Sequence, residues 1–141
     1  MKYNTITKEW TMLPELKVAR AKHCAIFHNG TIILTGGHWY NHNDGMVDPR
    51  NVLDSTEIYH LDKEYSEMGG NLNIRRQNFG LGIIKKNNSS KLIAFGGRSA
   101  SHTPYVRKCL LSSIEEWNDK EKKWEVSHLK LKEPKEEFGF C

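Results

Sequence analysis

The sequence lacks the long apolar runs that a membrane protein or a secreted protein would need. No stretch is long enough to cross a lipid bilayer, and no apolar segment follows the amino terminus as a secretory signal would require. The three cysteines, Cys24, Cys109 and Cys141, are an odd number at irregular spacing, so we expect no disulfide framework. This composition is typical of a soluble protein of a reducing compartment, and we expect a cytoplasmic chain that does not contact a membrane.

Charge of a single sign is also missing. The 21 basic and 17 acidic side chains give a net charge of +4, and the densest charged tract, from Glu115 to Glu137, mixes lysines with glutamates. A nucleic-acid backbone favours a stripe of positive charge, which this pattern does not provide. We therefore expect no nucleic-acid partner.

The sequence has no recognisable set of catalytic residues. No Ser/His/Asp, Cys/His or paired-carboxylate pattern stands out, and Cys24 beside His23 lies on a predicted strand, where successive side chains point to opposite faces. One loop contains four possible metal ligands, His38, His42, Asp44 and Asp48. No second group of ligands follows at a fixed spacing. We expect no metal, no cofactor and no enzymatic activity.

What the chain does contain is an internal repeat. Two glycine pairs begin at Gly36 and Gly96, 60 residues apart, and each ends an apolar run, at 31–35 and 91–95. Further apolar stretches precede these runs, at 22–27 and 78–84, and a polar turn joins each stretch to its run. The lengths favour strands over helices, and the Asn29-Gly30 turn is typical of a tight β-hairpin.

Other features recur at similar intervals. A basic residue followed three positions later by His or an aromatic, and then by a small residue, begins at Arg20, Arg76 and Lys135. Downstream of the glycine pairs, strands are predicted at 55–59 and 113–117, each with an aromatic that is followed by a second one after a charged turn. The aromatic pairs are Tyr3 with Trp10, Tyr59 with Tyr65, and Trp117 with Trp124. We expect the aromatics of the two full repeats to fill the space between neighbouring sheets.

Four short strands with a glycine pair after the second and aromatics on the third and fourth resemble the kelch repeat, one blade of a β-propeller. The resemblance implies an all-β fold of four-stranded antiparallel sheets. It divides the chain into a last hairpin of a preceding blade (1–12), two blades (20–68 and 76–126) and a first strand of a following blade (134–141). Closed propellers have typically 4 to 8 blades, so we expect an incomplete ring, a fragment of a larger propeller that self-associates through open blade edges.

The resemblance implies a protein-protein interaction module. Relatives in the kelch family often carry an amino-terminal dimerisation domain and serve as substrate adaptors of cullin ubiquitin ligases, or they bind actin. We expect neither of those regions in this chain, so the adaptor role is an analogy. Two alternatives stay open: a propeller-type enzyme, such as a copper oxidase or a sugar isomerase, and a truncated copy without function.

Binding residues are expected on the loops that follow the glycine pairs and on the connection between the blades. Both loops combine aromatics with arginine, as binding hot spots do, and arginine grips a carboxylate with paired hydrogen bonds. The sequence therefore predicts a protein or peptide partner, and the arginines favour an acidic one. The predicted binding residues are Trp39, Tyr40, His42, Arg50, Arg75, Arg76, Arg98, His102, Tyr105 and Arg107.

Overall fold

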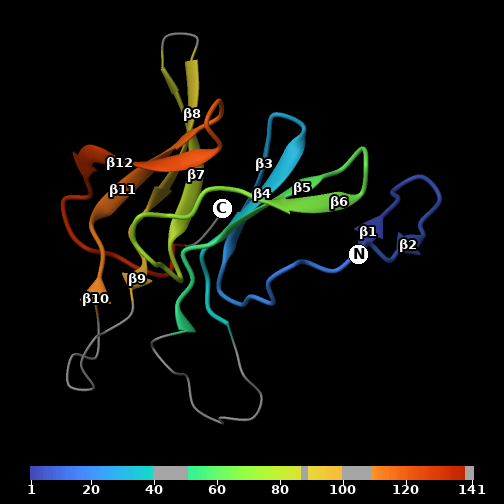
Figure 1. The fold of residues 1–141 in the computed structure, drawn as a ribbon, viewed down its shortest axis with the longest axis horizontal. Helices are drawn as coiled ribbons and strands as arrows, with labels where there is room; N and C mark the ends of the chain where they lie inside the picture. Colours follow the sequence, from blue (N-terminus) through green and yellow to red (C-terminus); the bar gives the residue numbers. More distant parts are fainter. Residues whose placement is uncertain (40–50, 87–88, 100–108, 139–141) are drawn as a thin grey trace.

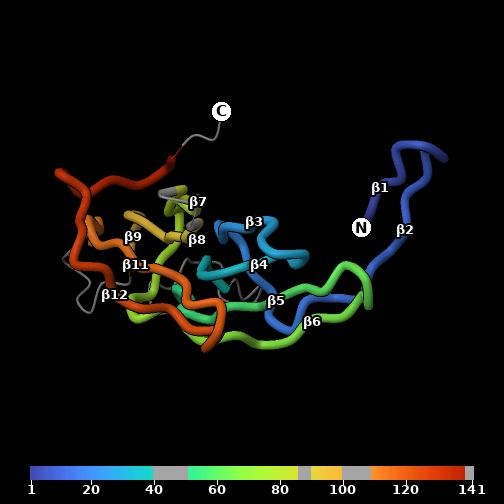
Figure 2. The backbone as a smooth tube through the Cα atoms, turned by 90° about the horizontal axis from the view of Figure 1, so that it is seen from above, coloured from blue at the N-terminus to red at the C-terminus, as the bar shows by residue number. Residues whose placement is uncertain are grey.

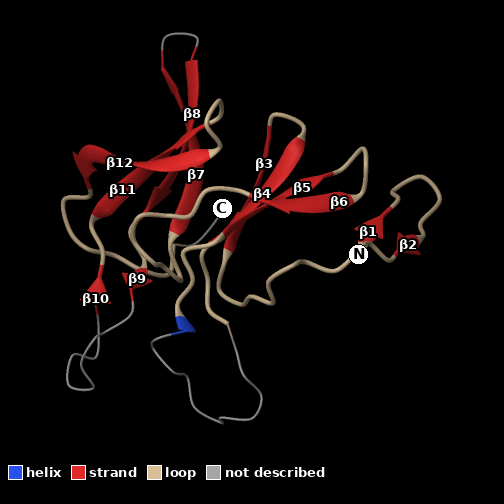
Figure 3. Cartoon of the chain, in the orientation of Figure 1, coloured by secondary structure: helices blue, strands red, loops and turns tan. Residues whose placement is uncertain are grey.

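The protein is described here from a computed structural model, which describes residues 1–39, 51–86, 89–99 and 109–138. Within these residues the chain is all-β, with antiparallel pairing throughout and no α-helix; the short helical turn drawn blue in Figure 3 is of the 3₁₀ type, at Asn51. The fold class predicted from the sequence is confirmed at this level. The bounds of the predicted blades stay a prediction.

Two four-stranded sheets make up most of the structure, and in both of them the strands follow one another in chain order. Sheet 1 consists of β3 (Cys24–His28), β4 (Thr31–Thr35), β5 (Thr56–His60) and β6 (Tyr65–Met68). Sheet 2 consists of β7 (Gly80–Lys86), β8 (Ser89–Phe95), β11 (Ser113–Asn118) and β12 (Lys123–Lys130).

Two smaller pairs accompany the sheets. The first is a hairpin near the amino terminus, β1 (Lys2–Tyr3) with β2 (Trp10–Thr11). The second follows the diglycine of sheet 2 and joins β9 (Arg98–Ser99) to β10 (Cys109–Leu110). Figure 1 shows the β1–β2 hairpin at one side of the molecule, next to sheet 1, and sheet 2 at the other side.

The strand predictions are confirmed to within two residues at most boundaries. The run at 31–35 is a strand over the same residues, and the run at 22–27 forms a strand two residues later. The Asn29-Gly30 turn has positive φ angles of 46° and 83°, as a tight hairpin turn requires. The backbone therefore follows the local sequence signals closely.

The two sheets share one hydrophobic core. Sheet 1 contributes Cys24, Ile33 and Ile58, and sheet 2 contributes a larger set that includes Phe79, just before β7, together with Leu81, Leu92, Ala94, Trp117 and Trp124. The innermost strands β3 and β7 lie side by side (Figures 1 and 2). The burial of both tryptophans confirms that aromatics fill the space between the sheets. The same expectation is wrong for Tyr65, which is exposed and stacks on His60 instead.

Candidate functional site

The glycine pairs Gly36-Gly37 and Gly96-Gly97 lie at the same end of their sheets. We call this end the loop end; it consists of residues 36–39, 51–55, 75–77, 96–99 and 109–113. Strands β9 and β10 belong to it, and they mark it at the lower edge of Figure 1. Backbone bridges tie its parts together, because His38 pairs with both Ala21 and Val52, and Gln77 pairs with Arg98. The end therefore has a fixed backbone frame.

The glycines allow the chain to approach the next repeat closely. Gly36 and Gly37 have φ angles of 61° and 97°, and Gly96 and Gly97 have 63° and 89°, in the left-handed region that favours glycine. A Cβ on Gly36 would lie 2.6 Å from the carbonyl oxygen of Arg76, at the start of the following repeat. A Cβ on Gly96 would lie 2.7 Å from the carbonyl oxygen of Lys135 in the same way. The glycine turn thus fixes the spacing between successive repeats.

In each repeat, an arginine near the start of the repeat reaches the loop end from the protein interior and binds its backbone. Arg20 donates to the carbonyl oxygens of Gly36 and Ser55 and to the Ser55 hydroxyl. In the second repeat Arg76 donates to the carbonyl oxygens of Gly96 and Ser113 and to the Ser113 hydroxyl. These repeated bonds hold the glycine turn to the strand that follows it.

Each of these arginines faces a buried glutamate. Arg76 Nη2 donates to Glu115 Oε1 at 2.8 Å, whereas the nearest contact of Arg20 with Glu57 is 3.9 Å, and all four side chains are 0% exposed. Burial lowers the pKa of both arginines, and the facing glutamates act in the opposite direction. Arginine still carries its charge at neutral pH, so both pairs are buried ion pairs.

The two glutamates also fix the connection that leads into each repeat. Glu57 accepts the backbone N–H groups of Lys17 and Val18, at 2.7 and 3.4 Å. Glu115 accepts those of Asn73 and Ile74, at 2.7 and 3.1 Å. In each repeat, the carboxylate on the third strand therefore binds the chain segment that leads into that repeat. Sequence reasoning missed these glutamates, although their interval matches that of the other repeated residues.

Arg76 must be removed from the predicted binding set. Its side chain is fully buried and bonds Gly96, Ser113 and Glu115 in the frame of its own repeat, so it cannot reach a partner. Arg75 and Arg76 are adjacent in the sequence, which does not indicate which of the two faces solvent. The charge of Arg76 is structural.

Three other predicted binding residues lie on the described part of the loop end. Trp39 is 41% exposed, and its backbone N–H donates to the carbonyl oxygen of Asn51. The exposed Arg75 lies 3.4 Å from Asp54. Arg98 is partly buried and donates to Glu136 at 2.8 Å from both Nε and Nη2. The exposed surface thus offers an indole ring and the guanidinium of Arg75, whose side chain is 54% exposed.

The other six predicted binding residues lie outside the described residues: Tyr40, His42, Arg50, His102, Tyr105 and Arg107. The backbone of their loops starts and ends at the loop end, at positions 39 and 51 and at positions 99 and 109.

A second polar site, which the sequence did not predict, lies between the sheets near their hairpin turns. His28 Nε2 contacts both oxygens of Asp119 at 2.9 and 3.0 Å, and the Lys122 ammonium bonds Glu67 at 2.6 Å. The Lys122 and His60 hydrogen bonds lower the pKa of Glu67. A pocket of about 200 Å³ opens beside these contacts. The contacts of Asp119 and Lys122 join the β11–β12 turn to sheet 1.

Cys24 is the only buried thiol among the described residues, and the packed core around it disfavours covalent chemistry. Its Sγ donates to the carbonyl oxygen of Phe79 at 2.9 Å, across the contact between β3 and β7. Burial raises its pKa to about 11, so the thiol stays protonated near neutral pH and is a poor nucleophile.

Among the described residues no cluster of three or more histidine, cysteine or acidic side chains is placed to hold a metal ion. Within the same residues no helix is long and apolar enough to cross a membrane. A scan against models of known protein families gives no match to the chain, and a search of curated proteins gives none either.

Proposed function

We propose that the chain is a module of a kelch-type β-propeller that binds another protein through its loop end. The observation that carries this proposal is the repeated frame, in which a buried arginine, a diglycine, a serine and a buried glutamate occupy the same places in both sheets. Two repeats are fewer than the 4 to 8 blades of closed propellers, which supports membership of a larger ring. The proposed parent is a substrate adaptor of a ubiquitin ligase or an actin-binding protein.

The loop end is the proposed contact surface because it combines a rigid frame with exposed anchor residues. Its backbone is fixed by the diglycine contacts and by the bridges of His38 and Gln77. Trp39 stands on this frame, and tryptophan and arginine are enriched at binding hot spots. Loops on a rigid scaffold bind with a small loss of conformational entropy.

We also propose that the loop end prefers an acidic peptide. The arginines that would bind such a peptide already form ion pairs within the chain, which limits this preference. Arg98 already binds Glu136, so a peptide carboxylate gains Arg98 only by displacing that glutamate. Arg75 has the more exposed side chain, 54% against 30% for Arg98. We therefore assign the first charged contact with the peptide to Arg75.

Selection of peptides from a random phage-displayed library on the purified chain tests the proposal. Enriched peptides are expected to lose at least about tenfold in affinity when Trp39→Ala removes the exposed indole. Trp10→Ala is the matched control, because Trp10 is exposed on the distant β1–β2 hairpin. Failure to enrich any peptide, or equal losses with the two variants, would argue against binding at the loop end.

The acidic preference has its own test. Glu136→Gln releases Arg98 from its ion pair, so an acidic peptide should bind several-fold more tightly, while Arg75→Ala should weaken the same peptide. Isothermal titration at two salt concentrations measures both effects. If neither substitution changes the affinity, protein binding can stand but the partner is not recognised by its acidic groups.

A further inference from the structure

The β1–β2 hairpin repeats the β11–β12 hairpin in detail. Tyr3 pairs with Trp10 in the first hairpin, and Trp117 pairs with Trp124 in the second. The rings of each pair contact one another, with centroids 4.9 and 5.2 Å apart.

The turns of the two hairpins are also the same. The Asn4 side chain accepts the backbone N–H groups of residues 6 and 7, and the Asn118 side chain accepts those of residues 120 and 121. Lys8 and Lys122 occupy the same turn position with positive φ angles of 62° and 49°. The two hairpins are therefore built for the same kind of contact.

The β11–β12 hairpin uses its aromatic pair to pack on sheet 1. The Trp124 indole N–H donates to Thr56 Oγ1 at 2.9 Å, and the Trp117 ring lies against Gly69 and its neighbour Ile58. At the turn, Lys122 bonds Glu67 with its ammonium and accepts the Gly70 N–H with its carbonyl oxygen. As a result Trp117 and Trp124 are only 7% and 4% exposed.

The β1–β2 hairpin makes no such contact in the described structure. Tyr3 is 42% exposed and Trp10 is 66% exposed. An exposed ion pair of Lys2 with Glu64, at the turn of sheet 1, joins this hairpin to the rest of the chain. Its aromatic pair is thus a contact surface that the single chain leaves uncovered.

Sheet 2 carries the matching face on the side away from sheet 1. The strand registers place Ile93 and Phe95 beside Ile114 and Glu116, in the positions that Ile33, Thr35, Thr56 and Ile58 occupy in sheet 1. Ile84 on this face is 48% exposed. Next to the face lies a pocket of about 430 Å³, lined by Leu131, Lys132, Glu133, Lys135 and Phe138. Leu131 lies four residues before Lys135, and Leu72 lies four residues before Arg76, so the two leucines occupy equivalent positions. Unlike Leu131, Leu72 is buried in the shared core.

We infer that the β1–β2 hairpin of one copy of this chain packs on the outer face of sheet 2 of a second copy. Trp10 lies over Phe95 and Ile114, and Lys8 forms an ion pair with Glu125, which has the place in sheet 2 that Glu67 has in sheet 1. Glu125 is exposed and has the opposite charge to Lys8. The contact copies an interface that already exists within the chain.

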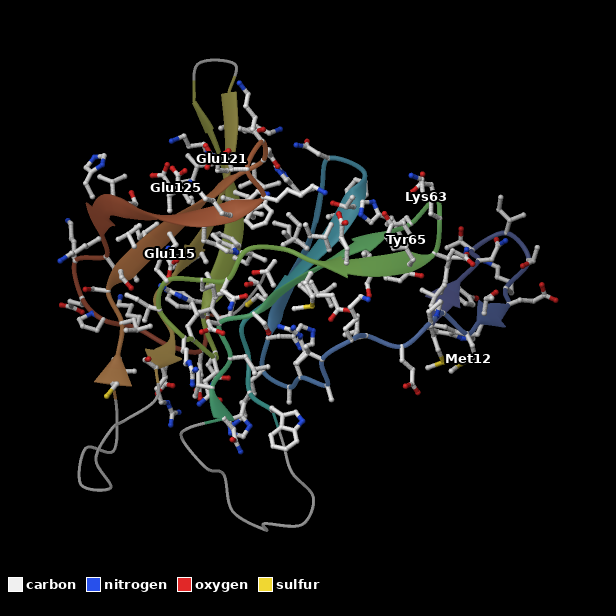
Figure 4. The ribbon with its side chains drawn as sticks, viewed as in Figure 1. Met12, Lys63, Tyr65, Glu115, Glu121 and Glu125 are labelled. Carbon is white, nitrogen blue, oxygen red and sulfur yellow. The ribbon has the colours of Figure 1, made fainter. Side chains whose placement is uncertain are left out.

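The geometry makes this contact intermolecular and directional. Figure 4 shows Met12, next to the β1–β2 hairpin, and Glu125, on β12, at opposite sides of the molecule. A hairpin that binds the far face of another copy forms a heterologous contact, which either closes a ring or grows head to tail. Ile114 stands where Thr56 accepts the Trp124 indole, so the Trp10 contact is apolar and weaker than the internal one.

Sedimentation equilibrium over a range of chain concentrations, from about 1 µM to about 1 mM, tests the inference. The mean mass is expected to rise with concentration, and Trp10→Ala should raise the dissociation constant at least about tenfold. Ile6→Ala is the matched control, because Ile6 is exposed on the turn of the same hairpin and outside its aromatic pair. A chain that stays monomeric throughout, or associates equally well as the Trp10→Ala variant, overturns the inference.

A charge exchange tests the register of the contact. Lys8→Glu and Glu125→Lys should each weaken self-association several-fold, since each places like charges opposite one another. An equimolar mixture of the two variants should recover association, because every contact between one variant and the other again joins opposite charges. Thermal unfolding of each variant checks that it folds. Folded variants whose mixture does not recover association overturn the proposed register.

Discussion

At the scale of single residues, two buried arginine-glutamate pairs hold the repeats together, and they are not equal. Arg76 bonds Glu115 directly at 2.8 Å, whereas Arg20 stands 3.9 Å from Glu57. Removing one partner of a buried ion pair leaves the other charge without compensation, which costs far more than losing an exposed pair. The second repeat therefore depends more strongly on its glutamate than the first.

Glu115→Gln is expected to lower the free energy of unfolding by about 3–5 kcal/mol, because Arg76 then stays buried without its counter-charge. Glu57→Gln should cost about 1–2 kcal/mol less, since Arg20 loses no direct hydrogen bond. Urea unfolding of both variants measures the difference. Equal costs would show that the direct bond between Arg76 and Glu115 does not matter for stability.

Gly97 and Gly30 form a matched pair for testing the close approach between repeats. Their φ angles are similar, 89° and 83°, but a Cβ on Gly97 would lie 2.5 Å from Phe79 Cβ, while nothing lies within 4 Å of one on Gly30. Both substitutions to alanine carry the backbone strain, about 1–2 kcal/mol. Gly97→Ala should cost about 1–3 kcal/mol more, because Phe79 and the Gln77 carbonyl must move. Calorimetry would contradict the packing argument if the two melting temperatures fell equally.

Sequence patterns predicted the positions of these residues better than their roles. The recurring basic residues at 20 and 76 are visible in the sequence, yet the place of Arg76 on the connection between the blades predicts a binding role that its burial rules out. Its burial depends on a glutamate 39 residues away, and no local pattern reports that contact. The same holds for Arg98, whose partner Glu136 comes from the next repeat.

At the scale of elements, the hairpins carry both the predictable and the unpredictable parts of the fold. Strands were predictable from apolar runs and turn residues, since both signals are local. The cross-strand partner of Tyr59 was not predictable. The register pairs Tyr59 with Ser66 and Tyr65 with His60. A shift of one residue moves a side chain to the other face of a strand, and this shift exposes Tyr65.

The docking of the β11–β12 hairpin on sheet 1 is expected to show as energetic coupling between Trp124 and Thr56. Trp124→Phe and Thr56→Val each remove one partner of the 2.9 Å bond, and each also changes packing or the neighbouring Thr35 contact. A double-mutant cycle cancels those separate costs. We expect a coupling of about 1 kcal/mol. Additive losses, measured by denaturant unfolding, would mean that the hydrogen bond does not contribute to docking.

At the scale of the whole molecule, the repeat is visible in the sequence, but its packing is not. The intervals predicted two similar units, and the structure has two sheets with the same strand order and the same arginine-glutamate frame. Which faces meet depends on contacts between residues far apart, such as Trp124 with Thr56 and His28 with Asp119. Periodicity within a strand cannot report such contacts, so the shared core and the uncovered aromatic hairpin became apparent only in three dimensions.

The shared core leads to a last prediction, that the two sheets unfold together. Cys24, Ile33 and Ile58 of sheet 1 pack in one cluster with Phe79 and Trp117 from the second repeat, so opening either sheet exposes the core of both. Gly97→Ala, which acts on the second repeat, should therefore reduce hydrogen-exchange protection in β4 as much as in β8. Trp10→Ala, outside the core, should leave both unchanged when measured at a concentration where the chain is monomeric. Unchanged protection of β4 in the Gly97→Ala variant would mean that each sheet is an independent folding unit, since neighbouring repeats then contribute no interface energy to one another.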